Sequence, residues 1–358
     1  MPLADKRDWL LGWRRYKETM AENPRIESVQ PSAAIPGGEV TIRGSGFTQR
    51  NGFRPTVTFG SSPGSLLLSS DNYLIARVPD GAAGGIVKVA TGHAESQPHR
   101  MALGVQIADN LHPVANPAVD TEGNIYVTFS GQRGQKVPVP LYKITPNYLV
   151  KPYVTELSNP TGLAIGKDGV LYVSCRNDGT IFRITPDGRA QRWVEGMGIA
   201  TGLAFDRHGD LFVGDRSGTI FKISPDRQIL VFATLEPSVA AYHLAFSAIG
   251  DLYVAGPSTS SFDRVYKITP GGDVSAFFRG LGRPQGLAFD ARGNLYVAAS
   301  FGGRRGIVRI TPDANAEVVV SGPAMVGLAL LPSRRAIVAT TSALFSLDWD
   351  IEGAALVA

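Results

Sequence analysis

The chain has 358 residues, a formal net charge of +4 and a hydrophobic fraction of 44%, which predicts about two domains with packed cores. Its 41 glycines and 24 prolines exceed the usual share and indicate an all-β protein with many turns. Lysines and arginines are scattered along the chain, which argues against nucleic acid as a partner, and no apolar run is long enough for a transmembrane helix.

Residues 4–22 are predicted to form an amphipathic helix. Its apolar stripe recurs at helical spacing and consists of Trp9, Trp13, Tyr16 and Met20. We expect this helix to dock on its own protein. The alternatives are a membrane-surface helix, because basic residues flank the tryptophans, and a partner-binding helix.

The compartment is predicted from the N-terminal segment and the cysteine content. The segment has no recognisable signal peptide, and the single cysteine, Cys175, excludes an intramolecular disulfide. Both features predict a cytoplasmic protein, with an extracytoplasmic location as the alternative if further chain precedes this sequence.

Short alternating segments separated by turn residues follow at residues 24–105. The expected strands lie at 24–31, 39–43, 56–60, 74–79 and 85–90, which predicts a β-sandwich. The phrases Ile-x-x-Val-x-Pro, Pro-Gly-Gly-x-Val-Thr-Ile-x-Gly-x-Gly-Phe, Val-x-Phe-Gly and Val-Pro-x-Gly occur in this order. The segment therefore resembles the IPT/TIG family of immunoglobulin-like domains, and this resemblance implies a spacer or a protein- or glycan-contacting module.

The rest of the chain repeats two phrases. The first reads Gly-Leu-Ala-Phe-Asp followed by Leu-Tyr-Val and occupies 160–173, 200–213 and 284–297; the second, such as Ile-Phe-Arg-Ile-Thr-Pro, occupies 181–186, 220–225, 265–270 and 307–312. The first glycine of the phrase lies at Gly162, Gly202, Gly286 and Gly327, and Asn116 and His243 take the same place in two further units. Steps of 40 to 46 residues between these positions fit four-stranded propeller blades.

We therefore predict an all-β fold with a helix at 1–23, a sandwich at 24–105 and a six-bladed β-propeller at 106–358. The outer strand of the last blade is expected from residues 102–108, with 351–358 as the alternative. The blade phrases resemble NHL-repeat propellers and the wider gluconolactonase-like (senescence-marker) superfamily, over about two thirds of the chain. This resemblance implies a binding or catalytic site at one mouth of the axial channel.

Two sets of loops are expected to meet at that mouth. The loops that lead into the inner strands contribute Thr161, Thr201, Tyr242 and Gln285. The loops after the second strands contribute Arg133, Arg176, Asp215, Arg216, Arg264 and Arg304. Guanidinium groups suit carboxylates and phosphates, so these loops predict a site for a small anion. The alternative is a solvated rim of local Asp–Arg pairs at 215–216 and 263–264. Tyr242 is expected to plug the channel, or to donate to the anion.

Gluconolactonase-like enzymes are similar in placing a Glu, an Asn and an Asp at the channel, where they bind a divalent cation such as calcium. A hard cation prefers carboxylate oxygens, but the inner-strand positions here are Thr161, Thr201 and Gln285. We therefore expect no metal or other cofactor. Asn116, Asn159 and Asp215 are the alternative metal ligands.

Streptogramin lyases are similar in using His and Glu on this face of a propeller. His112 and His243 lie on loops of the first and fourth units, so they are the candidate acid–base residues. Units three apart in six lie across the channel from each other, which argues that both histidines are packing residues.

The sequence thus predicts a non-catalytic protein that binds a small anionic ligand, a glycan or a protein partner. The alternative is a hydrolase or lyase acting on a lactone or cyclic ester in the central channel.

Overall fold

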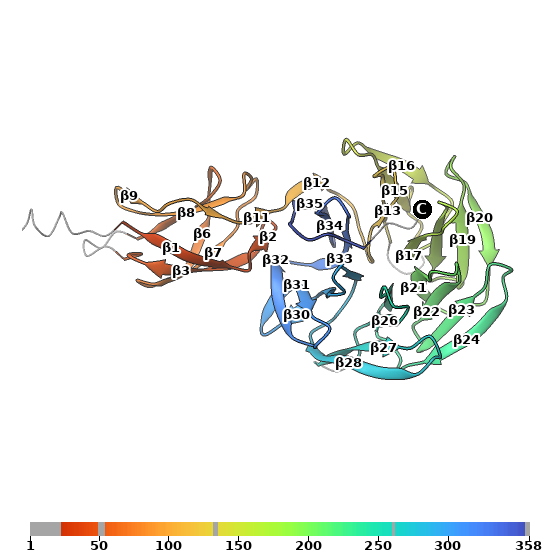
Figure 1. The fold of residues 1–358 in the computed structure, drawn as a ribbon. Coiled ribbons are helices and arrows are strands. Elements are labelled where there is room, and N and C mark those ends of the chain that lie inside the picture. The colour runs from red at the N-terminus through yellow and green to blue at the C-terminus, as the bar shows by residue number, and fades with distance from the viewer. Residues whose placement is uncertain (1–22, 49–53, 132–134, 260–261, 355–358) are drawn as a thin grey trace, which may run out of the picture. The chain divides into compact units, whose positions relative to one another are not determined.

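The computed structural model describes residues 23–48, 54–131, 135–259 and 262–354, and every regular element in these ranges is a β-strand (Figure 1). The all-β prediction is therefore confirmed. The predicted helix at 4–22 lies outside the described residues. No helix that could span a membrane occurs in the described part of the chain. The chain divides into two compact units between Leu103 and Gly104.

The first unit contains two antiparallel sheets. One has the order β1-β3-β7-β6, with β1 Arg25–Gln30, β3 Glu39–Ser45, β7 Tyr73–Arg77 and β6 Ser65–Ser69. The other has the order β10-β8-β4-β5, with β9 on β8; its strands are β10 His99–Arg100, β8 Ile86–Thr91, β4 Thr56–Phe59, β5 Ser62–Pro63 and β9 Ala94–Glu95. β2 (Ala33–Ala34) pairs in parallel with β11 (Ala102–Leu103). Both sheets contribute to one apolar core, which includes Ile42, Phe59 and Val87.

The second unit contains antiparallel four-stranded sheets, numbered here in chain order. Sheet 1 comprises β13 Ala118–Val119, β14 Ile125–Thr128, β15 Leu141–Ile144 and β16 Val150–Val154. Sheet 2 comprises β17 Pro160–Ile165, β18 Leu171–Cys175, β19 Thr180–Ile184 and β20 Ala190–Val194. Sheet 3 comprises β21 Ala200–Phe205, β22 Leu211–Asp215, β23 Thr219–Ile223 and β24 Ile229–Thr234.

The remaining sheets repeat this order. Sheet 4 comprises β25 His243–Phe246, β26 Leu252–Ala255, β27 Asp263–Ile268 and β28 Val274–Leu281. Sheet 5 comprises β29 Leu287–Phe289, β30 Leu295–Phe301, β31 Arg304–Ile310 and β32 Ala316–Ser321. Sheet 6 comprises β33 Met325–Leu330, β34 Arg335–Thr340 and β35 Leu344–Asp348, with β12 Val105–Ala108 as its outer strand.

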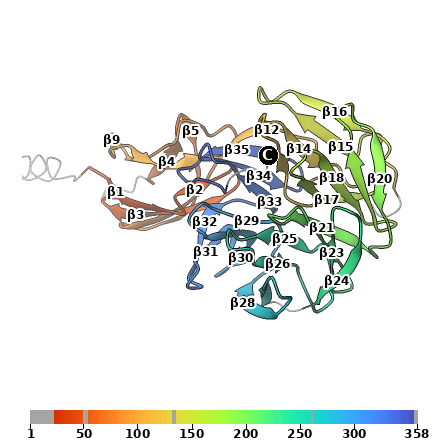
Figure 2. The ribbon, with the colours of Figure 1, turned by 45° about the vertical axis from the view of Figure 1, so that its right-hand side comes forward.

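Sheet 6 therefore combines the first strand of the second unit with its last three. Val105 lies opposite Ser346 and Gln106 opposite Phe345, in antiparallel register. The expected outer strand at 102–108 is thus found at 105–108. The sheets follow one another around a common centre (Figures 1 and 2), as is typical of β-propellers.

The second-strand phrase Leu-Tyr-Val explains how neighbouring sheets pack. Side chains alternate between the two faces of a strand. Leu171 and Val173 contribute to the core shared with sheet 1, whereas Tyr172 contributes to the core shared with sheet 3. The Tyr172 ring meets Phe205 of sheet 3 edge to face, 5.0 Å between centroids. Phe212 and Phe246 repeat this contact between sheets 3 and 4.

The glycine of the first phrase is required by the close approach of inner strands. A Cβ on Gly162 would lie 2.1 Å from the carbonyl oxygen of Thr201, and one on Gly202 would lie 2.4 Å from that of Tyr242. These contacts are shorter than any carbon–oxygen packing distance, so each inner strand packs backbone to backbone on the next. The centre of the unit is consequently crowded.

Candidate functional site

The threonines that begin the inner strands of sheets 2 and 3 are buried and hydrogen-bonded to the backbone. Thr201 Oγ1 donates to Gly214 O at 2.8 Å and accepts from Tyr242 N at 3.0 Å. Thr161 Oγ1 donates to Asn159 O at 3.4 Å. The Thr201 hydroxyl therefore connects two strands of sheet 3 and the neighbouring sheet 4, whereas the Thr161 hydroxyl makes a local bond.

Asn116 links three sheets at the centre of the unit. Its Nδ2 donates to Leu287 O of sheet 5 at 2.8 Å, and its Oδ1 accepts from Leu328 N of sheet 6 at 3.1 Å. A Cβ on Gly286 would lie 2.0 Å from the same Oδ1. Asn116, which precedes β13 of sheet 1, is thus held in the space that the glycine leaves.

The other candidate metal ligands are also bonded within their own sheets. Asp215 accepts from Ile199 N at 2.7 Å and from the Ser217 hydroxyl. Asn159 is buried, and its carbonyl oxygen accepts from Arg176 N at 3.2 Å. Among the residues that the structure describes, no group of three or more His, Cys, Asp or Glu side chains is placed to hold a metal ion.

The two histidines lie in different sheets and in different surroundings. His243 begins β25 and is 4% exposed, and this burial lowers its pKa to about 4. It is therefore neutral at physiological pH. His112 is exposed, forms a bridge with Phe129, and has its Nδ1 in contact with the carbonyl oxygen of Ser130.

The arginines of the predicted rim do not share a common partner. Where a hydrogen bond is described, each arginine bonds to a different residue. Arg176 Nη2 donates to Gly131 O at 3.1 Å, and Arg216 Nη2 donates to Val239 O at 2.7 Å. Arg304 is exposed at the start of β31, and Arg133 lies outside the described residues. The rim arginines thus connect to different loops.

The alternative of local Asp–Arg pairs also differs from the structure. Arg264 pairs with Glu236 at 3.1 Å, not with Asp263. Asp263 accepts from Ser258 N at 2.8 Å and Ser258 Oγ at 2.7 Å through one oxygen, and from Arg283 N at 3.1 Å through the other. Buried backbone N–H groups are nearly always hydrogen-bonded in proteins. The buried carboxylate of Asp263 accepts from two such groups, those of Ser258 and Arg283, and not from Arg264.

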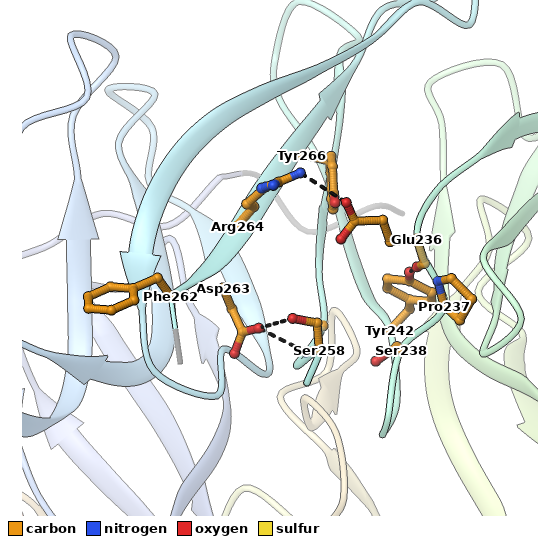
Figure 3. A pocket seen from close by; sticks show the side chains of 10 residues that line it. Glu236, Pro237, Ser238, Tyr242, Ser258, Phe262, Asp263, Arg264 and Tyr266 are labelled. Carbon is orange, nitrogen blue, oxygen red and sulfur yellow. Dashed lines mark hydrogen bonds and ion pairs between the residues drawn. The ribbon is translucent and has the colours of Figure 1, made fainter. Parts of the chain in front are cut away.

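Beside sheet 4 lies a pocket of about 40 Å³, hereafter the sheet 4 pocket (Figure 3). It lies between the loop that leads into β25 and described residues that follow β26 and begin β27. The residues that line it are Glu236, Pro237, Ser238, Tyr242, Gly256, Ser258, Phe262, Asp263, Arg264 and Tyr266. It brings together two residues of the predicted site, Tyr242 and Arg264. Gln285 is half-buried at the start of sheet 5, with its N–H bonded to Ala298 O, and does not line this pocket.

Tyr242 forms one wall of the pocket because glycines make room for its ring. A Cβ on Gly256 would lie 2.7 Å from Tyr242 Cδ1, and one on Gly214 would lie 2.9 Å from Tyr242 Cβ. The Tyr242 hydroxyl donates to the carbonyl oxygen of Glu236. Burial raises the pKa of Tyr242, so this hydroxyl stays protonated. The ring therefore packs beside sheet 4 and is held by the loop.

The ion pair of Arg264 and Glu236 lies along one side of the pocket, with Tyr266 beside it (Figure 3). The Phe262 ring is 72% exposed and points away from this pair (Figure 3). Glu236, Ser258 and Tyr266 were not predicted from the sequence. One sequence feature could have pointed to this pocket. The inner strands of sheets 2 and 3 begin with Thr-Gly, whereas that of sheet 4 begins with Tyr242-His243.

Comparisons with known proteins support the two units separately. Residues 24–99 match the IPT/TIG domain. No curated protein matches the chain in sequence. A solved structure described as a putative gluconolactonase is similar with a TM-score of 0.58 and 17% identity, over 70% of this chain and 93% of that one.

Two further solved structures are similar in fold. A gluconolactonase from Xanthomonas campestris has a TM-score of 0.58 and 17% identity, over 69% of this chain and 89% of its own. An auxiliary nutrient binding protein from Bacteroides ovatus has a TM-score of 0.53 and 12% identity, over 91% of this chain and 98% of its own. Residues 24–99 thus form an IPT/TIG domain, and the chain is similar in fold to solved structures described as gluconolactonases.

Proposed function

We propose that the protein is a non-catalytic binding protein whose second unit, a six-bladed β-propeller, holds a small anionic ligand, a glycan or a protein loop. The IPT/TIG domain, an immunoglobulin-like sandwich, would act as a spacer or a second contact. No metal or other cofactor is needed for this function.

The observation that carries the proposal is that polar side chains at the centre of the second unit are hydrogen-bonded to the backbone. Both polar atoms of the Asn116 amide and the hydroxyl of Thr201 are bonded to the backbone of neighbouring strands. A general base or metal ligand needs a free lone pair directed at the substrate. At the sheet 4 pocket, by contrast, charged and hydroxyl groups face an open volume.

The extent of the fold similarities gives further support. The similarity to the nutrient binding protein extends over 91% of this chain, and a second auxiliary nutrient binding protein, from Bacteroides thetaiotaomicron, matches over 91% with a TM-score of 0.55. The gluconolactonase similarities extend over about 70%. The similarity to the binding proteins thus extends over more of this chain than the similarity to the gluconolactonases does.

The alternative is a hydrolase or lyase that opens a lactone or cyclic ester at the channel, which the gluconolactonase similarities favour. The donor set argues against it. The side chains at the inner-strand starts include no carboxylate, and both oxygens of Asp215 are bonded within sheet 3. A calcium or magnesium ion at Asp215 would meet a single carboxylate whose oxygens already accept hydrogen bonds, whereas these ions prefer several oxygen ligands.

The test measures ligand binding and turnover on the same full-length protein. Saccharides, organic acids and short peptides are screened by thermal unfolding, where a ligand at 100 times its Kd adds about 2.7 kcal/mol. We expect a shift that Arg264→Gln abolishes and that Arg192→Gln, in an exposed ion pair on sheet 2, leaves intact.

Calcium, magnesium, manganese and zinc are then titrated, and hydrolysis of gluconolactone is followed in a pH-stat. We expect no saturable metal shift and no rate above the spontaneous reaction. Turnover that is lost in Asp215→Asn or Asn116→Ala would replace the binding proposal with the hydrolase.

A further inference from the structure

We propose that the sheet 4 pocket binds a neutral, hydroxyl-rich ligand, the exposed edge of one sugar unit, rather than an anion. This inference rests on the proposed binding function and names its ligand class. It departs from the anion predicted from the rim arginines, because the structure assigns those arginines to separate partners.

The charges that line the pocket do not favour an anion. Arg264 contributes the only positive charge among the lining residues, whereas Glu236 and Asp263 contribute two negative charges. Arg264 is already paired with Glu236 at 3.1 Å. An anion that approached Arg264 would be repelled by the carboxylates of Glu236 and Asp263, and a cation would be repelled by the guanidinium.

The unused hydrogen-bonding groups are both donors and acceptors. Within the described residues, Arg264 makes one hydrogen bond to Glu236, although a guanidinium has five N–H groups. Glu236 Oε2 and the Tyr266 hydroxyl have no hydrogen-bond partner among the described residues. An alcohol donates one hydrogen bond and accepts others, so adjacent hydroxyls can bridge Arg264 and Glu236 without breaking the pair.

The remaining polar groups of the pocket are fixed and cannot turn toward a ligand. The Ser258 hydroxyl donates to Asp263 at 2.7 Å, and the Ser238 hydroxyl donates to Pro257 O at 2.8 Å. The Tyr242 hydroxyl donates to the Glu236 carbonyl oxygen. Recognition therefore falls to Arg264, Glu236 and Tyr266.

The size of the pocket matches two or three hydroxyl groups. Its volume of about 40 Å³ has room for about three water molecules. Ligand hydroxyls that replace such waters and reproduce their hydrogen bonds gain affinity. The ring of the sugar would lie outside, so the pocket suits one exposed edge of a glycan.

The experiment titrates the full-length protein with the methyl glycosides of glucose, galactose and mannose, and with acetate and phosphate, by isothermal titration calorimetry. We expect at least one glycoside to bind with a Kd of about 1 mM. Glu236→Gln should weaken it about tenfold, as expected for a hydrogen bond to a charged group, and Tyr266→Phe about threefold. Glu195→Gln, which removes an exposed carboxylate from the Arg192 pair on sheet 2, should leave the Kd unchanged.

Tyr266→Phe removes a single hydroxyl, so an unchanged unfolding midpoint separates lost binding from lost folding. Three outcomes would overturn the inference: no glycoside binds, a glycoside binds equally well to all variants, or acetate or phosphate binds and Arg264→Gln abolishes it. The last outcome leaves the proposed binding function standing with an anionic ligand. Metal-dependent lactone turnover without glycoside binding would remove both proposals.

Discussion

Sheets 3 and 4 have the same strand order and nearly the same inner strand, but different side chains at its start. Sheet 3 begins with Thr201 and Gly202, and sheet 4 with Tyr242 and His243. Thr201 uses its hydroxyl to bond two strands. Tyr242 uses its ring to fill space between sheets and its hydroxyl to hold a loop. Sheet 3 thus keeps the repeated arrangement of the inner strand, whereas sheet 4 has a pocket beside it.

The comparison teaches that the pocket depends on small residues in neighbouring strands. Gly214 near the end of β22 and Gly256 after β26 lie where a Cβ would meet the Tyr242 side chain. The corresponding residue of sheet 2 is Ser174, whose hydroxyl contacts Thr201 O instead. A bulky side chain at the start of an inner strand therefore requires glycine on both sides.

The largest expected effect is the loss of the Tyr242 ring. Tyr242→Ala should lower the free energy of unfolding by about 3–5 kcal/mol, because a buried aromatic side chain leaves a cavity. Urea unfolding of the full-length protein measures this loss.

A double-mutant cycle makes the comparison sharper. Gly256→Ala alone should destabilise the protein, since its Cβ would meet Tyr242 at 2.7 Å. In the Tyr242→Ala background the same change should be neutral or stabilising. Additive effects would show that the ring and the glycine are independent.

The second effect concerns His243, which replaces the glycine of sheet 3. Its pKa is lowered by burial from 6.5 to about 4, so the unfolded chain binds its proton first as the pH falls. Stability should be complete above pH 6.5 and should decrease by up to about 3 kcal/mol as the pH falls toward 4.

Urea unfolding between pH 7 and pH 4 measures this dependence. His243→Gln should remove that component of the pH dependence, and His208→Gln, on an exposed turn, should retain it. Equal pH profiles for the wild type and His243→Gln would contradict the burial argument.

The third effect tests the close backbone contact between Gly202 of sheet 3 and Tyr242 of sheet 4. Gly202→Ala should cost about 2 kcal/mol, because its Cβ would lie 2.4 Å from Tyr242 O. Gly271→Ala is the control: its Cβ would be 3.7 Å from the nearest atom, and the change should be close to neutral. A neutral Gly202→Ala would mean that sheet 4 can move away from sheet 3.

The smallest effect isolates the Tyr242 hydroxyl. Tyr242→Phe keeps the ring and removes the hydrogen bond to Glu236 O, which should cost about 1 kcal/mol. Because this bond holds the loop of Glu236, glycoside affinity should fall together with stability. If Tyr242→Phe lost as much stability as Tyr242→Ala, the hydroxyl and not the ring would account for the stabilisation by Tyr242.

The structural role of the repeated residues could be predicted from the sequence, because residues at the same place in the phrase make the same contact in successive sheets. Gly162 and Gly202 mark inner strands that pack backbone to backbone, and Tyr172 and Phe212 mark the contact between sheets. The strands at these phrases were predicted on this basis, and the outer strand that was expected at 102–108 lies at 105–108. The orientation of Tyr242 could not be derived from the repeats, because it depends on Gly214 and Gly256, which lie against its side chain.

The pocket residues could not be predicted for a related reason. Glu236 belongs to no repeated phrase, and Tyr266 lies in the second phrase at a position where the copies at 181–186, 220–225 and 307–312 have Phe or Val. The proximity of the two residues depends on how a loop folds between two sheets. The rim arginines were predicted by position, yet their partners, such as Gly131 O and Val239 O, are backbone atoms that no side-chain pattern reveals.

The pairing of β12 with β35 has a consequence for synthesis on the ribosome. β12 ends at Ala108 and its partner begins at Leu344, so β12 leaves the ribosome long before β35 exists. At 5–20 residues per second this wait is roughly 10–50 s. During that time the edge of β12 has no partner in its sheet, and the other sheets are an open arc. The second unit is therefore expected to be most vulnerable to aggregation in the last seconds before its final strand appears.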